Sequence, residues 1–560
     1  MSSQPRRSGG QILVDALRIH GADHAFCVPG ESYLAVLDAL VDAPIALTVC
    51  RQEGGAAMMA DAYGKLTGRP GICLVTRGPG ATNASAGVHV AHQDSTPMIL
   101  LIGQVARGTT EREAFQEIDF RRMYGPLCKW VAQIDQAERI PEFMARAFRT
   151  ATSGRPGPVV LALPEDMLTE RVDATDTRPY EPARPYPDPD AMQRLRGELE
   201  SAQRPLVIAG GSGWDARACA DLRAFAEANA LPVAASFRRQ DLIDNRSPSY
   251  AGEAGIGVNP KLARRIGEAD LLLVAGARLG EKTSSDYRLF DIPVPAQKLI
   301  HVHAGAEELG RVYQPDLAIL AASGHFAAAA RALAPVAEPR WRDWTAAAHA
   351  DFQAWNAPVE CPGAVQPAEI VGWLAGRLPE DAIVCNGAGN YSAWVQRFFR
   401  YRGFRTQLAP TSGSMGYGTP AAVAAKRIHP GRTVVGFAGD GCFMMTGQEL
   451  ATAVQYGLGV IFIVVNNGMY GTIRMHQERE YPGRVSGTAL VNPDFAALAR
   501  AYGAWGAAVE RSADFAPAFE QALASAGPAL IELRIDPEAI SPTRTLSGLR
   551  RAAEDKRPGR

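Results

Sequence analysis

A repeated alternation along the chain constrains its fold more than any other feature. Short runs rich in Val, Ile and Leu alternate with Ala-rich amphipathic segments that end at Gly or Pro. Runs such as "VIFIVV" (460–465) are apolar at every position, which is typical of parallel strands covered by helices on both faces. The pattern predicts an α/β protein built of βαβ units in doubly wound parallel sheets.

The chain is too long for one ordinary hydrophobic core, since it has 560 residues. Two stretches without periodicity, 171–190 and 336–363, mix prolines with polar residues and are predicted to be linkers. We therefore expect three domains, at residues 1–170, 191–335 and 364–545.

Composition excludes several classes of partner. The chain is 47% hydrophobic and 21% charged, its formal net charge is −1, and Lys/Arg clusters stand only near its two ends. We expect no nucleic-acid and no membrane partner, because neither a basic patch nor an apolar span is visible. The eight cysteines lack metal-ligand spacing, and the first ten residues lack an apolar signal core. These features predict a cytoplasmic protein with free thiols.

The first and third predicted domains resemble each other. The stretches 71–105 and 433–468 both read as apolar strand, Gly-rich loop, helix and apolar strand, with polar residues after each strand. We interpret this as one fold used twice. Ligands of open parallel sheets bind beyond the carboxyl ends of strands, so two such domains could share one ligand.

The segment "GDGCFMMTGQELATAVQYGLGVIFIVVNNG" places an acid and an amide after two successive strands. Its glycines Gly439 and Gly441 allow close approach of a ligand, and the N–H groups of the following helix favour an anion. The next strand then returns Asn467 to the same sheet edge as Asp440. Hard oxygen ligands of this kind suit Mg²⁺ bridging a diphosphate. The alternative is a capped turn followed by a turn-forming Asn pair, which the joint spacing disfavours.

This spacing resembles the diphosphate and Mg²⁺ signature of thiamine-diphosphate enzymes. In addition, "RQEGGAAMMADAYGKLTGRPG", "RGPGATN", "IGQV", "AFQEID", "GSMGYGTPAA" and "NPDFAALARAYGA" resemble the acetolactate synthase-like branch in the same order. The resemblance covers about Gly9 to Pro542. It implies a pyrimidine-binding domain, a central Rossmann-like domain and a diphosphate-binding domain, with thiamine diphosphate and Mg²⁺ as cofactors.

The resemblance also implies residue roles. Asp440, Asn467 and the carbonyl of Met469 match the metal ligands. Glu53 matches the glutamate that hydrogen-bonds the pyrimidine and thereby helps to remove the thiazolium C2 proton, although a first-turn helix acid would look the same. Met415 matches the apolar wedge that bends the cofactor, unless it is ordinary packing. The implied cofactor-binding residues are Pro29, Gly30, Glu53, Asn83, Gly413, Met415, Gly439, Asp440, Gly441, Cys442, Asn467, Met469 and Tyr470, with Cys442 replacing the usual serine.

Other positions match the substrate pocket of acetolactate synthases. The implied catalytic residues are Glu53, Gln104, Gln116 and Lys129; the implied pocket residues are Phe115, Thr472 and His476. Lys129 could instead be a solvated charge, and Phe115 a core aromatic. Met475 and His476 stand where the family has a Gln-Trp pair, which leaves the acceptor open.

The central domain contains half of a dinucleotide fingerprint, Gly211-Ser212-Gly213, without a ribose-binding acid. Arg278 is retained from the flavin-associated segment of the family, but both acids of that segment are lost. FAD, ADP or no nucleotide therefore remain as alternatives for this domain.

The resemblance implies decarboxylation of a small 2-oxo acid and carboligation of the resulting enamine to an acceptor. It further implies a homodimer or homotetramer with active sites at the subunit interface. The alternative is a decarboxylase or lyase of the benzoylformate, benzaldehyde or 2-hydroxyacyl-CoA type. A dinucleotide-dependent redox enzyme and a cofactor-binding protein without turnover are disfavoured, because neither needs Glu53.

Overall fold

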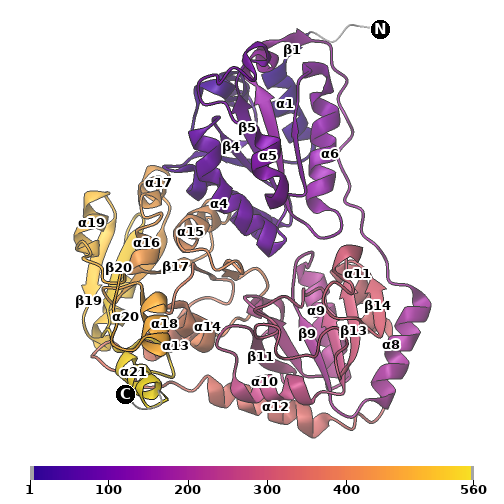
Figure 1. Ribbon diagram of the computed structural model, residues 1–560, viewed down its shortest axis with the longest axis vertical. Helices are drawn as coiled ribbons and strands as arrows, with labels where there is room; N and C mark the ends of the chain where they lie inside the picture. Colours follow the sequence, from indigo (N-terminus) through magenta and orange to yellow (C-terminus); the bar gives the residue numbers. More distant parts are fainter. Residues whose placement is uncertain (1–5, 557–560) are drawn as a thin grey trace. The chain divides into compact units, whose positions relative to one another are not determined.

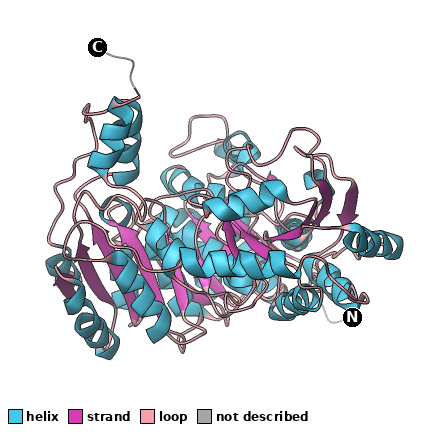
Figure 2. Ribbon diagram, turned by 90° about the horizontal axis from the view of Figure 1, so that it is seen from below, coloured by secondary structure: helices cyan, strands magenta, loops and turns pink. Residues whose placement is uncertain are grey.

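The computed structural model describes residues 6–556. Its contacts divide the chain into two compact units, Met1–Pro185 and Tyr186–Arg560. Figure 1 labels the elements, and Figure 2 shows the strands lying between helices. Three six-stranded sheets, each parallel throughout, confirm the predicted α/β class.

The first unit holds one six-stranded sheet in the order β3-β2-β4-β5-β7-β6. One sheet face packs on α1 and α6 around a buried apolar cluster, and α3 and α4 pack together against β4 and β5. Its elements are β1 (Arg7–Ser8), α1 (Gly9–Ile19), β2 (His24–Cys27), α2 (Leu34–Val41), β3 (Ala46–Val49), α3 (Glu53–Thr67), β4 (Gly71–Val75), α4 (Pro79–Asp94), β5 (Met98–Gln104), α5 (Phe120–Tyr124), β6 (Trp130–Gln133), α6 (Ile140–Thr152), β7 (Pro158–Pro164), α7 (Glu165–Thr169) and β8 (Arg171–Val172).

The second unit contains two sheets. Its central part orders its strands β11-β10-β9-β12-β13-β14, the arrangement of dinucleotide-binding folds. The elements of this part are α8 (Pro189–Ser201), β9 (Pro205–Ala209), α9 (Ala216–Ala228), β10 (Val233–Ser236), β11 (Tyr250–Ala254), α10 (Pro260–Glu268), β12 (Leu271–Ala275), β13 (Lys298–His303), β14 (Leu317–Leu320), α11 (Ser323–Ala332) and α12 (Arg342–Trp355).

The C-terminal part of the second unit has the order β16-β15-β17-β18-β20-β19. Counted in chain order, this matches the main sheet of the first unit strand for strand. Its elements are α13 (Pro367–Arg377), β15 (Ile383–Asn386), α14 (Ser392–Phe398), β16 (Gln407–Leu408), α15 (Gly418–Ile428), β17 (Val434–Gly439), α16 (Asp440–Phe443), α17 (Glu449–Gln455), β18 (Val460–Asn466), α18 (Gly471–Glu480), α19 (Phe495–Ala501), β19 (Trp505–Val509), α20 (Phe515–Ala524), β20 (Ala529–Arg534) and α21 (Leu546–Glu554).

The stretches predicted as linkers are more ordered than expected. Within 336–363 the chain forms helix α12, and Phe352 of this helix is buried in the central core. Within 171–190 the residues at the start pair as β8 with β1, and α8 begins at Pro189. The prolines flank these elements instead of interrupting them. Because the composition of the stretch is dominated by these prolines, helix α12 was not predicted. In the described part of the chain no helix combines the length and apolar character needed to cross a membrane.

Candidate functional site

Two adjacent strands of the C-terminal sheet position the predicted metal ligands. β17 pairs with β18 in parallel, and Gly439 lies opposite Val465. Asp440 therefore leaves one strand where Asn466 and Asn467 leave the next. The predicted convergence of the acid and the amide at one sheet edge is present in the second unit.

A cavity of about 240 Å³ opens at this edge. Ten residues predicted from the sequence line it together: Gly413, Met415, Gly439, Asp440, Gly441, Cys442, Asn467, Met469, Tyr470 and Thr472. They come from the loop before α15 and from the segments after β17 and β18. We call this space the cofactor-side cavity.

Asp440 is 3% exposed and well anchored. Burial raises the pKa of its carboxyl above the usual range, while hydrogen bonds from Gly441 N–H (2.9 Å) and Asn492 Nδ2 (2.7 Å) oppose that rise. Among residues 6–556 no cluster of three or more His, Cys, Asp or Glu side chains could hold a metal. The donor set at Asp440 therefore fits a hard cation only when amide, backbone and ligand oxygens complete the shell.

The structure distinguishes the two neighbouring asparagines. Asn466 Oδ1 accepts hydrogen bonds from Gly468 N–H and Asn492 Nδ2, both at 3.0 Å, and its Nδ2 donates to Glu532 at 2.7 Å. Asn466 thus braces the loop, whereas Asn467 lines the cavity. The role of Asn467 as a metal ligand stays a prediction.

Gly441 and Cys442 shape one wall of the cavity. A Cβ on Gly441 would lie 2.6 Å from the Tyr470 ring, so only glycine fits there. Cys442 is buried, and its Sγ accepts a hydrogen bond from Gly416 N–H at 3.2 Å and lies 3.3 Å from Tyr391 Oη. The thiol therefore ties the Met415 loop to the start of α16.

Sequence reasoning missed several residues of this cavity. Asn390, Tyr391 and Trp394 also line it and follow β15, the neighbour of β17. Asn492 bridges Asp440 and Asn466 from the "NPDF" segment. The sequence held a signal for each asparagine. Asn390 follows an apolar run, and Asn492 stands in a motif that resembles the family. A single Asn is nevertheless too common to predict a site.

Helix α18 carries the two predicted acceptor residues on different sides. Thr472 Oγ1 donates to Asn390 Oδ1 at 2.9 Å and faces the cofactor-side cavity. His476 is exposed, and Arg479 Nη2 donates to its Nδ1 at 3.1 Å. Partial loss of solvent around the ring lowers the pKa of His476, and the nearby Arg479 charge lowers it further. A role for His476 in the substrate pocket stays a prediction.

In the first unit, Glu53 and Asn83 lie together. Glu53 opens α3, and Gln52 caps this helix by accepting a hydrogen bond from Gly55 N–H at 2.9 Å. Asn83 Nδ2 on α4 donates to Glu53 Oε2 at 3.0 Å. The carboxylate is half-buried and held at the carboxyl edge of the sheet.

The loop after β2 approaches the end of β4 closely. A Cβ on Gly30 would lie 2.5 Å from the Thr76 side chain, while Pro29 is exposed. Both residues lie at the sheet edge that also holds Glu53. Their predicted contact with the cofactor stays a prediction.

Gln104, Phe115 and Gln116 gather at the same edge. Gln104 is buried at the end of β5 and hydrogen-bonds the backbone through both side-chain atoms, donating to Ile118 O and accepting from Val105 N–H, each at 2.9 Å. Gln116 adopts a positive φ of 65° and packs against Gly78. Phe115 is 72% exposed, so it is not a core aromatic of this unit.

Lys129 lies at the opposite edge of that sheet. Its N–H donates to Pro158 O at the start of β7, whereas Gln104 is registered with Pro164 at the end of the same strand. Six residue steps at about 3.3 Å separate the two ends by roughly 20 Å. Lys129 Nζ donates to Ser153 O at 2.6 Å. The unit therefore does not bring Lys129 beside Gln104, and a catalytic role for Lys129 stays a prediction.

The central part offers little room at its flavin-like segment. Arg278 is ion-paired with Glu308 at 3.3 Å, and the cavity beside it measures about 110 Å³. Ligand pockets of drug-sized molecules usually measure about 300–1,000 Å³. A Cβ on Gly211 would lie 1.9 Å from Gly276 O, so close packing of two loops explains this glycine. The segment therefore combines a small cavity with a paired Arg278, and FAD binding stays a prediction.

Family models of thiamine pyrophosphate enzymes match three stretches of the chain. The N-terminal thiamine pyrophosphate-binding domain matches residues 7–123, the central domain 192–330, and the C-terminal thiamine pyrophosphate-binding domain 387–533. Asp440 lies in the third stretch, and Glu53 lies in the first.

Curated relatives are similar over nearly the whole chain. The acetolactate synthase large subunit of Parasynechococcus marenigrum (strain WH8102) is 35% identical over 94% of this chain and 87% of its own length. The acetolactate synthase isozyme 2 large subunit of Escherichia coli (strain K12) is 32% identical over 94% of this chain and 96% of its own. The acetolactate synthase large subunit of Corynebacterium glutamicum is 32% identical over 93% and 86%.

Proposed function

Because the chain belongs to the thiamine pyrophosphate enzymes, in their acetolactate synthase-like branch, we propose that it decarboxylates a 2-oxo acid and joins the remaining fragment to an acceptor. Bound thiamine diphosphate supplies the electron sink for loss of CO₂. The protein's own residues bind and orient the reactants and control protons.

In this proposal Asp440, Asn467 and the Met469 carbonyl would hold Mg²⁺, which would supply positive charge for binding the diphosphate. The support is the buried carboxylate of Asp440, braced by Asn492 and by backbone N–H groups, beside a cavity lined by both other residues. A divalent cation would neutralise a carboxylate that burial otherwise disfavours in its charged form.

Glu53 would exchange a proton with the pyrimidine ring. Its support is the position at the first turn of α3, where Asn83 fixes one carboxylate oxygen at 3.0 Å and leaves the other available. Gln104, buried at the end of β5, would help to shape the reaction site.

The observation that carries the proposal is the convergence of ten sequence-predicted residues on one cavity at adjacent strand ends. The test is to incubate purified protein with thiamine diphosphate, Mg²⁺ and a panel of 2-oxo acids. We expect CO₂ release with at least one donor and a ligated product in mass spectrometry. Absence of CO₂ release with every donor would overturn the proposal.

A decarboxylase or lyase is the second candidate, and one observation favours it. α18 carries Met475 and the exposed His476 where a Gln-Trp pair is expected from the resemblance, so the acceptor wall differs. Product analysis separates the two functions, because a decarboxylase releases the fragment left after loss of CO₂ as a free aldehyde, whereas a carboligase joins that fragment to the acceptor.

We further propose that the active enzyme is a homodimer or homotetramer with sites completed by a second copy, working in the cytoplasm on small 2-oxo acids. Glu53 and Asp440, which the predicted site needs together, lie in separate units of the chain, and this supports the proposed oligomer. No disulfide links any of the eight cysteines, all of which lie in the described part of the chain, and this suits a reducing compartment. FAD is not needed for this chemistry.

A further inference from the structure

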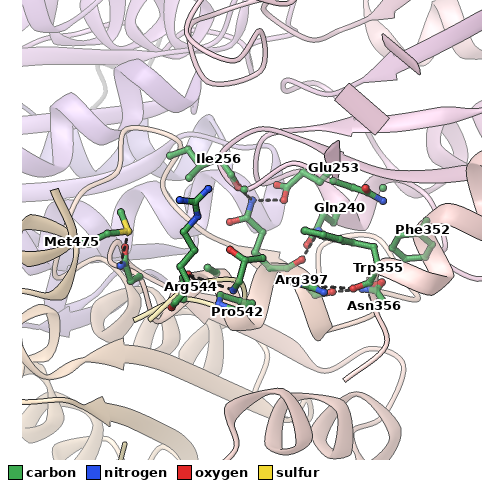
Figure 3. A pocket seen from close by; sticks show the side chains of 18 of the residues that line it. Gln240, Glu253, Ile256, Phe352, Trp355, Asn356, Arg397, Met475, Pro542 and Arg544 are labelled. Atoms are coloured by element: carbon green, nitrogen blue, oxygen red, sulfur yellow. Dashed lines mark hydrogen bonds between the residues drawn. The ribbon is translucent and has the colours of Figure 1, made fainter. Parts of the chain in front are cut away.

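A second and larger cavity, of about 520 Å³, lies within the second unit between its central and C-terminal parts. Figure 3 shows it from close by, with Met475 toward one end and Phe352 and Trp355 toward the other. Nothing in the proposed reaction so far uses this space. We call it the remote cavity.

Positive charge dominates the lining of the remote cavity. Arg397, Arg479, Arg544 and Lys556 all line it, and none forms an ion pair with an acidic side chain of residues 6–556. Elsewhere in the same unit arginines pair closely, as Arg550 does with Glu478 at 2.7 Å. Four cations that line one cavity without acidic partners favour the binding of an anion there.

One acid lines the remote cavity, and it offsets little of this charge. Glu253 is buried and accepts hydrogen bonds from Arg238 N–H and Gln396 Nε2, the latter drawn in Figure 3. Burial raises the pKa of Glu253 to about 7, so near neutral pH it carries only part of a negative charge. The cavity therefore stays cationic.

Asn390 joins the two cavities. It lines both, and it is tied to the wall between them: its Nδ2 donates to Ile540 O at 3.0 Å and contacts Met475 Sδ at 3.4 Å, while its Oδ1 accepts from Thr472. The side chain of Asn390 thus separates a ligand in the remote cavity from the cofactor-side cavity.

Helix α18 spans this wall in a direction that suits an extended substrate. Thr472 faces the cofactor-side cavity, Met475 stands at the wall, and Arg479 lines the remote cavity one helical turn further on. A turn advances about 5.4 Å, which is the length of a short carbon chain. At the far end Arg397 stacks on Trp355 with 3.7 Å between its Cζ and the ring centroid.

We propose that the remote cavity binds a second anionic group of the acceptor, so that the preferred acceptor is an organic anion whose carboxylate or phosphate lies several bonds from its reacting carbonyl. This inference rests on the proposed function and names the substrate class for it. The reacting carbonyl lies in the cofactor-side cavity, and the remote anion meets Arg479, Arg544 and Arg397.

The test compares acceptors matched in their reacting ends. Holoenzyme with the best donor of the panel is supplied with 2-oxoglutarate or 2-oxopentanoate, which differ by a remote carboxylate. A second pair, glyceraldehyde 3-phosphate and glyceraldehyde, differs by a remote phosphate. The ratio of apparent KM within each pair is the readout. We expect the anionic member of one pair to have a KM about ten- to a hundredfold lower, as for one or two charge-assisted hydrogen bonds.

The variants Arg544→Gln and Arg397→Gln should each reduce that ratio at least severalfold. Arg544 is exposed and makes no side-chain bond to residues 6–556, so its variant should fold even if loss of the Trp355 contact disturbs Arg397→Gln. Arg551→Gln is the matched control, because Arg551 is exposed on α21 and does not line the remote cavity. Added salt should weaken the preference in the wild type.

Three outcomes would overturn the inference. Equal KM values within both pairs would do so, and so would a preference that survives both arginine variants. A flavin that copurifies with the wild type and is lost in Arg397→Gln would assign the cavity to a different ligand.

If no donor releases CO₂, the proposed function fails, and calorimetry with unreactive probes still tests the site. Glutarate should then bind more tightly than butyrate to the wild type, and Arg544→Gln should lose this difference. Equal binding of the two probes would reject the remote anion site itself.

Discussion

Asp440 is the residue on which cofactor binding should depend most. Its buried carboxylate faces the cofactor-side cavity, where a diphosphate would repel it unless a divalent cation lies between them. We expect Asp440→Ala to abolish metal-dependent binding of thiamine diphosphate in calorimetry. The wild type in EDTA should show the same loss. Unchanged affinity in EDTA would remove the metal from the site.

Glu53 should control proton transfer and not cofactor affinity. It is half-buried at the start of α3 with Asn83 as its fixed partner. Glu53→Gln should fold and bind thiamine diphosphate but exchange the C2 proton about 10²- to 10⁴-fold more slowly, as expected when a general acid–base group is lost. NMR measures this exchange. Glu138→Gln, at an exposed position of the same unit, is the control, and exchange at the wild-type rate in Glu53→Gln would contradict the assignment.

Glu253 should make stability depend on pH. Its pKa of about 7 in the folded protein lies above the ordinary value of 4.5, so its stabilising contribution is complete below about pH 4.5 and is lost as pH rises through 7. At 1.36 kcal/mol per unit, the loss is about 3 kcal/mol. Urea unfolding from pH 5 to 8 should show Glu253→Gln becoming more stable relative to the wild type as pH rises. Parallel curves would show that Glu253 does not titrate in this range.

At the scale of elements, α18 couples the two cavities of the second unit. Its buried Glu478 accepts hydrogen bonds from Arg550 of α21 at 2.7 and 2.8 Å, and these bonds hold the pKa of Glu478 at about 2. The carboxylate therefore stays charged at neutral pH and ties the two helices together. Figure 1 shows α21 next to α18.

The same helix should set acceptor choice through Thr472. The short, polar Thr472 leaves more room at the cavity than a long apolar side chain would, so we predict poor discrimination between pyruvate and 2-oxobutyrate as acceptors. Thr472→Met should change the ratio of the two ligation products, one from pyruvate and one from 2-oxobutyrate, in a competition assay. His476→Ala, at an exposed position of α18, is the comparison. A strong preference for 2-oxobutyrate that neither variant alters would show that α18 does not select the acceptor.

At the scale of the whole molecule, the chain carries Glu53 in one compact unit and Asp440 in the other. If a site combines the first unit of one copy with the second unit of another, two inactive variants can complement each other. Co-expressed Glu53→Gln and Asp440→Ala should regain about a quarter of wild-type activity, because half of randomly formed dimers contain one intact site of two. Recovery that stays at the level of the separate variants would place both residues of a site in one copy.

Much of this architecture could be predicted from local patterns. Continuous apolar runs of five to seven residues, such as 460–465, form strands because only a sheet buried on both faces accepts an apolar side chain at every position. The Gly439-Asp440-Gly441 loop and Asn467 could be placed at one edge because parallel strands align their carboxyl ends. Helix α12 escaped prediction because its flanking prolines dominated the composition of that stretch.

Tertiary structure alone decided the contacts that depend on residues distant in sequence. The sequence specified which strands and loops form and which side chains leave their ends, since those follow from backbone geometry and local polarity. It could not show that Asn492 braces Asp440, that Asn390 separates two cavities, or that one of these cavities is lined by four cations without an acidic partner in the described part of the chain. These features arise where separate segments pack together, and the free energy of each contact depends on a partner that no local pattern identifies.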